Sequence, residues 1–221
     1  MMSGYLAHMK SLVAALVLPL FASPATAHPH VFVEAEGVYI FDADGGLAGV
    51  KIDWLYDAFS TLVLYDTLDL DRDGDGQLND DDLEKIKLGE TDWPPDYEGD
   101  TYLWIDGQKQ NLSRPHNASA YIVDDQVGVT FELYLDNTVN VSGLTASLKL
   151  YDPYYYYAYS VSGAGQTGDH GTECQVSVKR FTPDEEETAL QRKLAALSRE
   201  EMPQDENIGA LFAEEIVLQC D

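Results

Sequence analysis

The sequence predicts an α+β protein built on an antiparallel β-sheet domain. Apolar and polar residues alternate through several segments, which is typical of strands with one buried face. Helical spacing interrupts this alternation at about residues 54–89 and again near residue 185. We therefore expect an antiparallel sheet with an inserted EF-hand-like helix–loop–helix and a C-terminal helix.

Strand patterns begin with a hairpin at residues 30–56, where "DADGG" supplies a turn able to take positive φ. Pro153 cannot sit inside a central strand, so it should divide the apolar stretch around it into two strands. A second hairpin turns at Asp124 and Asp125. Further strands are expected at residues 101–110, 144–162, 174–181 and 214–220.

Helical spacing within the insertion places Phe59, Leu62, Val63 and Leu70 near one apolar face. A second short helix follows the acidic loop, and Gly89 is expected to close it. The two helices and the loop between them have the order of an EF-hand.

The C-terminal helix has a recognisable start. Thr182 is expected to be its N-cap, with Pro183 at the first helical position and Glu185 three residues after the cap. An apolar stripe should run along it, formed by Leu190, Leu194 and Leu197.

The first 27 residues have the pattern of a secretory signal peptide. Lys10 precedes an apolar run at residues 12–22, which is followed by the small residues "ATA". The run is too short for a stable membrane anchor, and no other run is longer. We expect cleavage after Ala27, and residues 28–221 then form a single secreted domain in the periplasm.

The net charge of the chain limits the kinds of molecule that it is expected to bind. The chain has 13 Lys and Arg against 39 Asp and Glu, a net charge of −26 over 221 residues. Like charges repel, so this net charge argues against nucleic acid and anionic lipid as partners. Metal ions are favoured, although most of the acidic residues are expected to form a solvated surface.

The stretch "DRDGDGQLNDDD" predicts a calcium loop. Asp71, Asp73 and Asp75 occupy positions 1, 3 and 5, and glycine at position 6 permits the sharp turn. Gln77 at position 7 is expected to offer its backbone carbonyl. Asp82 at position 12 is one methylene shorter than the usual glutamate, which weakens bidentate binding. A weak, single loop outside the cytosol indicates a structural Ca²⁺ ion, and an exposed acidic turn without an ion is the alternative.

The predicted mature N-terminus offers nitrogen ligands. His28 would carry both an imidazole and a free α-amine, and His30 lies two residues further along an extended segment. This donor set suits Zn²⁺, Ni²⁺, Co²⁺ or Cu²⁺. The alternative is a frayed terminus whose histidines meet only water. His116 and His170 lie in polar loops, and the sequence does not show whether either joins a metal site.

Cys174 and Cys220 predict one disulfide, because paired cysteines of exported proteins are usually oxidised. The bond would close a loop of about 45 residues, which stabilises the fold by ~3–4 kcal/mol in the chain-entropy model. A thiolate metal site or a nucleophilic cysteine is the alternative. The tyrosine run "YDPYYYYAYS" favours sheet packing over an aromatic platform for a sugar or peptide.

No catalytic motif is present in the sequence, so we do not expect an enzyme, although a secreted enzyme stays open as a third class of function.

Four segments together resemble one bacterial family of unknown function, DUF1007: "AHPHVFVEA", "DLDRDGDGQLNDDDLEKI", "LKLYDPYYYYAYS" and the late cysteine segments "CQVSVKR" and "VLQC". The resemblance implies a periplasmic component of an uncharacterised ABC-type transport system. It also implies a genomic setting beside nickel/cobalt-type permeases or zinc-responsive genes.

Two functions are therefore expected. The first is a periplasmic metal-binding accessory or solute-binding protein linked to transition-metal transport, with a structural calcium loop and a membrane metal permease as partner. The alternative is a calcium-stabilised protein-interaction module with no transition-metal role.

Overall fold

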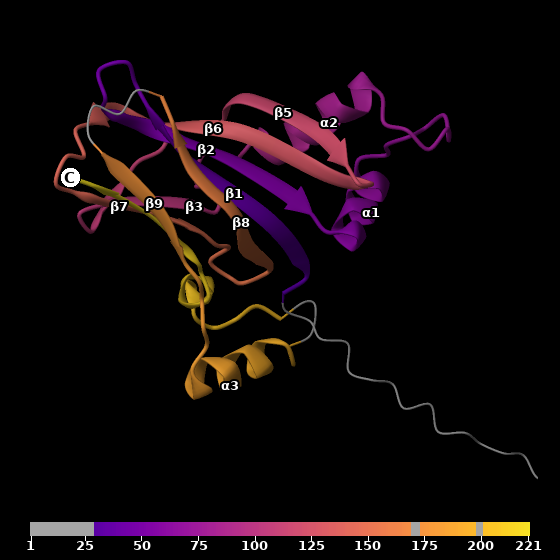
Figure 1. Ribbon diagram of the computed structural model, residues 1–221. Helices are drawn as coiled ribbons and strands as arrows, with labels where there is room; N and C mark the ends of the chain where they lie inside the picture. Colours follow the sequence, from indigo (N-terminus) through magenta and orange to yellow (C-terminus); the bar gives the residue numbers. More distant parts are fainter. Residues whose placement is uncertain (1–28, 169–172, 198–200) are drawn as a thin grey trace, which may run out of the picture.

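Two five-stranded sheets and three helices make up the fold (Figure 1). The computed structural model describes residues 29–168, 173–197 and 201–221. The predicted signal peptide and His28 therefore lie outside the described residues. Within those residues, no helix is long and apolar enough to cross a membrane.

The first sheet, sheet A, has the strand order β5-β6-β2-β1-β8. Its strands are β5 (His116–Val123), β6 (Gln126–Val139), β2 (Leu47–Tyr56), β1 (Val31–Phe41) and β8 (Tyr157–Thr167). Both predicted hairpins are confirmed, and Asp124 and Asp125 each take positive φ in the turn between β5 and β6. The expectation of a wholly antiparallel sheet is wrong at one place, because β1 pairs in parallel with β8.

The second sheet, sheet B, has the order β4-β3-β7-β10-β9. Its strands are β4 (Gln108–Gln110), β3 (Thr101–Ile105), β7 (Thr145–Leu150), β10 (Glu215–Cys220) and β9 (Cys174–Lys179). Pro153 lies in the turn between β7 and β8, as predicted. The C-terminal strand β10 is inserted between β7 and β9, so the end of the chain completes this sheet.

The inner faces of the two sheets share one hydrophobic core. Residues two apart on β1, among them Val33, Ala35 and Tyr39, are buried, while Glu34 and Glu36 face outward. Inner residues of β2, β6, β7 and β10 join the same cluster. Tyr39 links the sheets directly, because its hydroxyl donates to the carbonyl of Ile216 at 2.8 Å.

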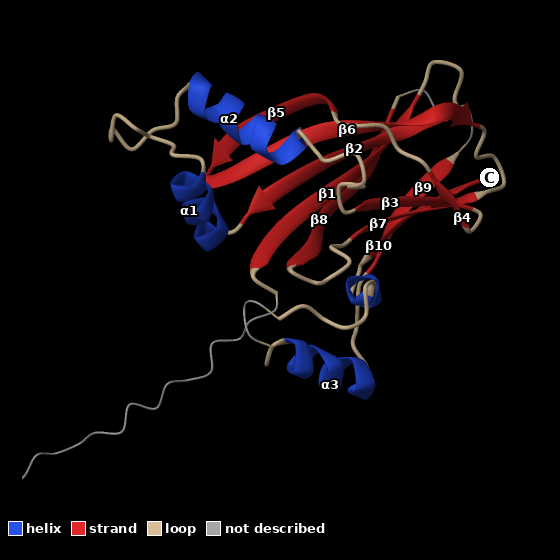
Figure 2. Ribbon diagram, turned by 180° about the vertical axis from the view of Figure 1, so that it is seen from behind, coloured by secondary structure: helices blue, strands red, loops and turns tan. Residues whose placement is uncertain are grey.

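Helices α1 (Ala58–Thr67) and α2 (Asp80–Thr91) lie between β2 and β3 in the chain. Figures 1 and 2 both show them at the end of sheet A away from sheet B. Gly89 does not end α2, which continues to Thr91. A Cβ at Gly89 would lie 3.4 Å from the side chain of Leu68, an ordinary van der Waals contact, so α2 packs beside the end of α1 at this position.

The predicted apolar face of α1 is mostly exposed. Phe59, Leu62 and Val63 are 62%, 67% and 46% exposed. The buried side instead carries Thr61, whose hydroxyl accepts a hydrogen bond from the backbone N–H of Val127 at 3.0 Å. This polar contact with β6 fixes the rotation of the helix and turns its apolar residues outward.

Helix α3 (Glu185–Leu194) and the short 3₁₀ helix η1 (Ile208–Leu211) form a small separate cluster. The N-cap of α3 is Asp184 and not Thr182, because Asp184 and Glu187 form a reciprocal capping box. The predicted apolar stripe is confirmed in this cluster, with Leu190, Leu194 and Leu197.

Candidate functional site

The acidic loop joins α1 to α2 and brings three carboxylates together. Oxygen atoms of Asp71, Asp73 and Asp75 lie within 4.8 Å of one another. Asp73 and Asp75 are exposed, and Asp71 is half-buried. Calcium is bound by oxygen ligands of this kind, so the residues present fit such an ion.

Backbone donors hold the loop in its curved form. The N–H groups of Asp75 and Gly76 donate to Asp71 Oδ1 at 3.1 and 3.3 Å, and Gln77 N donates to Asp75 Oδ1 at 2.8 Å. Gly76 has φ +80°, the positive value that the sharp turn requires. Gln77 is exposed, and the next residue, Leu78, packs against the core.

The structure does not bring Asp82 into this cluster. Asp82 is only 2% exposed, and its Oδ1 accepts a hydrogen bond from the ammonium of Lys85 at 2.8 Å. Its other oxygen accepts from Asn79 N at 3.4 Å, as part of the capping box of α2. Hydrogen bonding to Lys85 is the main reason that its pKa is lowered. The carboxylate at loop position 12 is therefore already paired with a cationic side chain.

His30 lies just before β1, beside the turn that precedes β8. His30 is half-buried, and its ring centroid lies 4.6 Å from that of Tyr156. Its backbone N–H donates to the Tyr156 carbonyl at 2.8 Å. The apolar residues Val31, Phe59 and Val63 line the same small pocket. The backbone here is fixed against β8, so His30 does not belong to a frayed segment.

The remaining histidines do not meet His30 in the described residues. His116 is exposed on β5, where it contacts Tyr134 edge-on at 5.5 Å. The strand register places it level with Val38, eight residues along β1 from His30. At ~3.3 Å per residue this separates the two histidines by more than about 25 Å. His170 lies outside the described residues.

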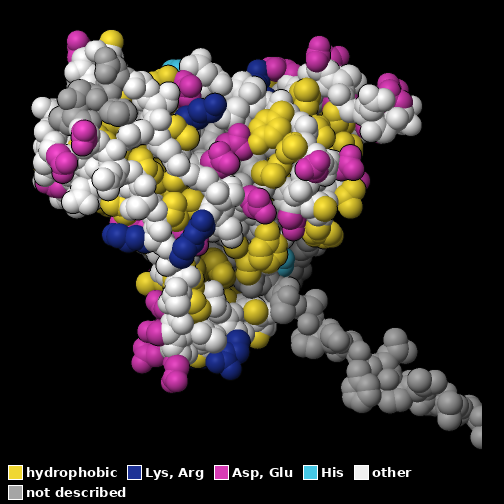
Figure 3. Space-filling view, in the orientation of Figure 1, with side chains coloured by type: hydrophobic (Ala, Val, Ile, Leu, Met, Phe, Trp, Pro, Cys, Tyr) yellow, Lys and Arg dark blue, Asp and Glu magenta, His cyan; other side chains and the backbone are white. Residues whose placement is uncertain are grey.

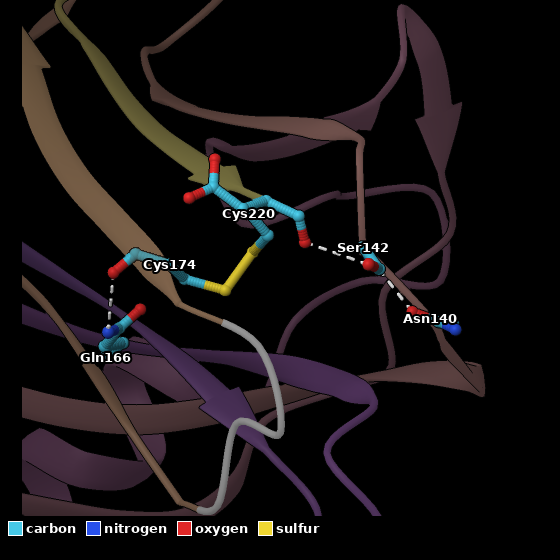
Figure 4. The surroundings of a disulfide bond; sticks show 6 residues. Asn140, Ser142, Gln166, Cys174 and Cys220 are labelled. Atoms are coloured by element: carbon cyan, nitrogen blue, oxygen red, sulfur yellow. Dashed lines mark hydrogen bonds between the residues drawn. A yellow bond between two sulfur atoms is a disulfide. The ribbon is translucent and has the colours of Figure 1, made fainter.

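The predicted disulfide between Cys174 and Cys220 is present, with its sulfur atoms 2.08 Å apart (Figure 4). The two cysteines are directly opposite each other on β9 and β10. Gln166 Nε2 donates to the Cys174 carbonyl at 3.2 Å and so connects the bond to β8. A disulfide of this kind is typical of proteins outside the reducing cytosol.

The tyrosine run separates into different environments. Tyr155 has φ +58° and packs against Phe212, 4.4 Å away, in the cluster around α3. Tyr157 and Tyr159 belong to β8 and pack against the main core, as the sheet-packing interpretation predicts. The hydroxyl of Tyr159 donates to Asp100 Oδ2 at 2.8 Å.

Two buried acidic residues, Glu90 and Asp100, were missed by the sequence analysis. Asp100 is 3% exposed, and burial together with the charge of Asp152 raises its pKa to about 7. Burial also raises the pKa of Glu90, against a hydrogen bond from Tyr56 that lowers it. Neither residue is part of a recognisable sequence motif. The signal available was the aromatic connector "TDWPPDYEGD", which directly follows Glu90 and ends at Asp100.

The described features define a class of protein: a two-sheet α+β domain with a disulfide and an acidic loop between its first two helices. The chain belongs to the family described as "Protein of unknown function (DUF1007)", whose model matches residues 13–220. It is also 27% identical over 213 residues to an uncharacterized protein of Haemophilus influenzae. That similarity covers 93% of this chain and 98% of the relative.

Proposed function

We propose that the protein is a periplasmic metal-binding accessory or solute-binding protein linked to transition-metal transport. Calcium in the acidic loop would stabilise the α1–α2 region. Zinc, nickel, cobalt or copper at the N-terminal histidines would be the cargo, exchanged with a membrane metal permease. The signal-peptide pattern, the disulfide and the resemblance to transport components support the location and the setting.

The convergence of Asp71, Asp73 and Asp75 is the observation that carries the calcium proposal. Three carboxylates within 4.8 Å repel one another, and the nearby ammonium of Lys85 is paired with Asp82. A divalent cation would relieve this repulsion and cross-link α1 to α2. The loop ion would therefore act on stability and leave cargo binding to other residues.

The transition-metal proposal depends on His30 and on the predicted terminus. The backbone of His30 is held at the edge of the fold by β8. His28 would add a second imidazole and an α-amine, so two residues would supply three nitrogen donors. Carboxylates alone would give a harder site, which suits calcium and magnesium better.

Calcium binding can be tested by thermal unfolding of the processed protein after chelation. Calcium is expected to raise the melting temperature of the wild type, and Asp71→Asn should remove most of the rise. Asp136→Asn is the matched control, because it removes the same charge from an exposed position on β6. Equal calcium responses in all three proteins would refute the loop assignment.

Cargo binding can be tested by competitive titration of zinc, nickel, cobalt and copper against a chelating dye. His30→Ala, and separately one alanine added before His28, should each weaken binding because each removes nitrogen donors from the site. His116→Ala should leave it unchanged. If the extended protein and His30→Ala bind as tightly as the wild type, the terminus is not the metal site.

A second candidate function is a calcium-stabilised interaction module. The exposed side chains of Phe59, Leu62 and Val63 favour it, since they form an apolar face on α1. Figure 3 shows hydrophobic side chains in the region of α1, with acidic groups beside them. A photo-crosslinker at position 62 should capture a partner in cells, and one at the exposed Leu211 should not. Equal labelling from both positions would argue against this module.

A further inference from the structure

A cavity of about 230 Å³ lies between the inner face of sheet A and the connector that follows α2. It is separate from the acidic loop and does not include His30. Most of its lining residues are aromatic or acidic: Trp54, Tyr56, Gly89, Glu90, Asp92, Trp93, Pro94, Tyr97, Tyr157 and Tyr159. Pockets for drug-sized ligands have volumes of ~300–1,000 Å³, so this cavity suits a smaller molecule.

The rings around the cavity hold one another in place. The centroid of Trp54 lies 6.4 Å from that of Trp93 and 5.8 Å from that of Tyr159. Tyr97 meets Trp93 edge-on at 5.5 Å, and Tyr157 stacks with Tyr159 at 6.2 Å. Trp93 is further fixed by its indole N–H, which donates to a carbonyl of α2 at 2.6 Å. The walls are therefore preorganised and do not need a ligand to assemble them.

Glu90 places a carboxyl group in this aromatic wall. Its Oε2 accepts a hydrogen bond from the Tyr56 hydroxyl at 2.5 Å. Asp92 adds an exposed carboxylate at the cavity. No Lys, Arg or His side chain occurs among the described residues that line the cavity.

One cationic side chain, that of Arg114, contacts residues of the cavity wall. Arg114 stacks over the Trp93 ring at 5.6 Å, and its guanidinium donates to the carbonyls of Pro94 and Tyr97 at 3.0 and 3.2 Å. These contacts fix the connector from the side opposite the cavity. They do not neutralise Glu90, whose carboxyl group is hydrogen-bonded to Tyr56 and forms no ion pair in the described part of the chain.

A second buried carboxyl, that of Asp100, lies behind the tyrosines. Its Oδ2 accepts from the Tyr159 hydroxyl, while Oδ1 has no hydrogen-bond partner within the described residues. Asp152 adds a further negative charge near it. The field at the cavity is therefore negative from the wall and from the residues behind it.

We propose that this cavity binds a small primary alkylamine in its protonated form. The ammonium would pair with the carboxylate of Glu90, and the faces of Trp54, Trp93 and the tyrosines would add cation–π attraction. The alkyl chain would lie against the rings. This site goes beyond the proposed metal-linked function, because it shares no residue with the loop or the histidines.

The chemistry of the walls favours an amine over a metal ion. Calcium takes six to eight oxygen ligands, whereas this cavity offers mainly ring faces and one fixed carboxyl group. A quaternary ammonium would satisfy the rings but could not donate a hydrogen bond to Glu90. A primary ammonium can use both features.

The test is isothermal titration calorimetry with n-butylamine at neutral pH. The buffer contains a chelator that removes calcium and transition metals. Glu90→Gln keeps an acceptor for Tyr56 but removes the charge, and it should weaken binding roughly ten- to hundredfold. Glu98→Gln is the matched control, because Glu98 is exposed and pairs with Lys109 outside the cavity. It should bind the amine as the wild type does.

A second pair of variants tests the rings separately. Tyr97→Leu should weaken binding roughly two- to thirtyfold, and Tyr97→Phe, which keeps the ring, should not. Fluorescence in a Trp104→Phe background would report on Trp54 and Trp93, the two tryptophans in the wall. Absence of binding at millimolar amine, or equal binding by the wild type, Glu90→Gln and Tyr97→Leu, would overturn the proposal. Tetramethylammonium binding as tightly as butylamine would overturn the role of Glu90.

Discussion

The ammonium of Lys85 lies 2.8 Å from Oδ1 of Asp82, the carboxylate at the twelfth position of the acidic loop. Asp82 is buried, and both residues of the pair belong to α2. Lys85 also donates to the carbonyl of Asp69, just before the loop, at 3.3 Å. A calcium ion that uses Asp82 must therefore displace Lys85. The lysine competes with the ion for the carboxylate that completes the predicted ligand set.

Removing this competitor should strengthen calcium binding. We expect Lys85→Met to bind calcium roughly two- to fivefold more tightly, because partly exposed ion pairs contribute up to about 1 kcal/mol. Lys87→Met is the control, because this substitution removes the same charge from the same helix. Lys87 pairs with Glu84 and not with Asp82. Calorimetric titration with calcium provides the measurement. A Lys85→Met protein no tighter than the control would mean that Asp82 is not a ligand.

The buried Asp100 predicts an unusual dependence of stability on pH. Its pKa is about 7 in the folded protein, against ~3.9 for an unfolded aspartate. Between these values the folded state holds a proton that the unfolded state has lost, so this residue makes stability fall as pH rises from about 4 to 7. The full loss is roughly 4 kcal/mol above pH 7 and is absent below pH 4.

Asp100→Asn should remove this loss, because the amide stays neutral and can still accept from Tyr159. Asparagine also tolerates the φ of +48° at this position. The variant should therefore gain stability relative to the wild type from pH 5 to pH 8 in urea unfolding. Asp106→Asn, an exposed aspartate with φ +46°, is the control. A constant difference between Asp100→Asn and the wild type at all pH values would show that Asp100 is ionised throughout.

Local patterns in the sequence predicted the elements better than their packing. Alternation located the two hairpins of sheet A, and the pair of aspartates at positions 124 and 125 marked a turn that needs positive φ. The same reasoning failed for α1, because Thr61 bonds to the backbone of β6 and overrides the apolar periodicity. The parallel pairing of β1 with β8 depends on residues more than a hundred positions apart, which no local pattern reveals.

The candidate sites divide in the same way. Asp71, Asp73 and Asp75 converge as their spacing predicts, because a continuous loop carries all three. The partner of Asp82 was not predicted, although an acidic residue and a lysine three positions apart on a helix are neighbours. Glu90 lies in the last turn of α2 and acquires its aromatic surroundings only when β2 and β8 pack beside it.

The hydroxyl of Tyr39 provides a test of how the sheets are joined. It is fully buried and donates to the Ile216 carbonyl at 2.8 Å. Tyr39→Phe should lower the free energy of unfolding by about 1–3 kcal/mol, because a buried acceptor loses its partner. Tyr154→Phe, at a position 37% exposed, should change it little. Urea unfolding followed by circular dichroism measures both, and equal effects would refute the inter-sheet role.

The disulfide should stabilise sheet B locally as well as the whole fold. Cys174 and Cys220 join β9, at the edge of sheet B, to β10 inside it. The native protein should therefore show no thiol reactive to alkylation until it is reduced and unfolded. Replacing both cysteines by alanine should cost about 2–4 kcal/mol of unfolding free energy, since the unfolded chain loses a cross-link.

The location of the disulfide also predicts which strand becomes less stable when the bond is removed. In the double alanine variant, amides of β9 should exchange with solvent faster, because an edge strand has one neighbour and loses its covalent tie. Amides of β2, at the centre of sheet A, should exchange as in the wild type under conditions where only local opening contributes. Hydrogen exchange followed by mass spectrometry separates the two strands. Two thiols that react readily in the native protein would refute the disulfide, and equal acceleration in β2 and β9 would show that the bond acts only on global unfolding.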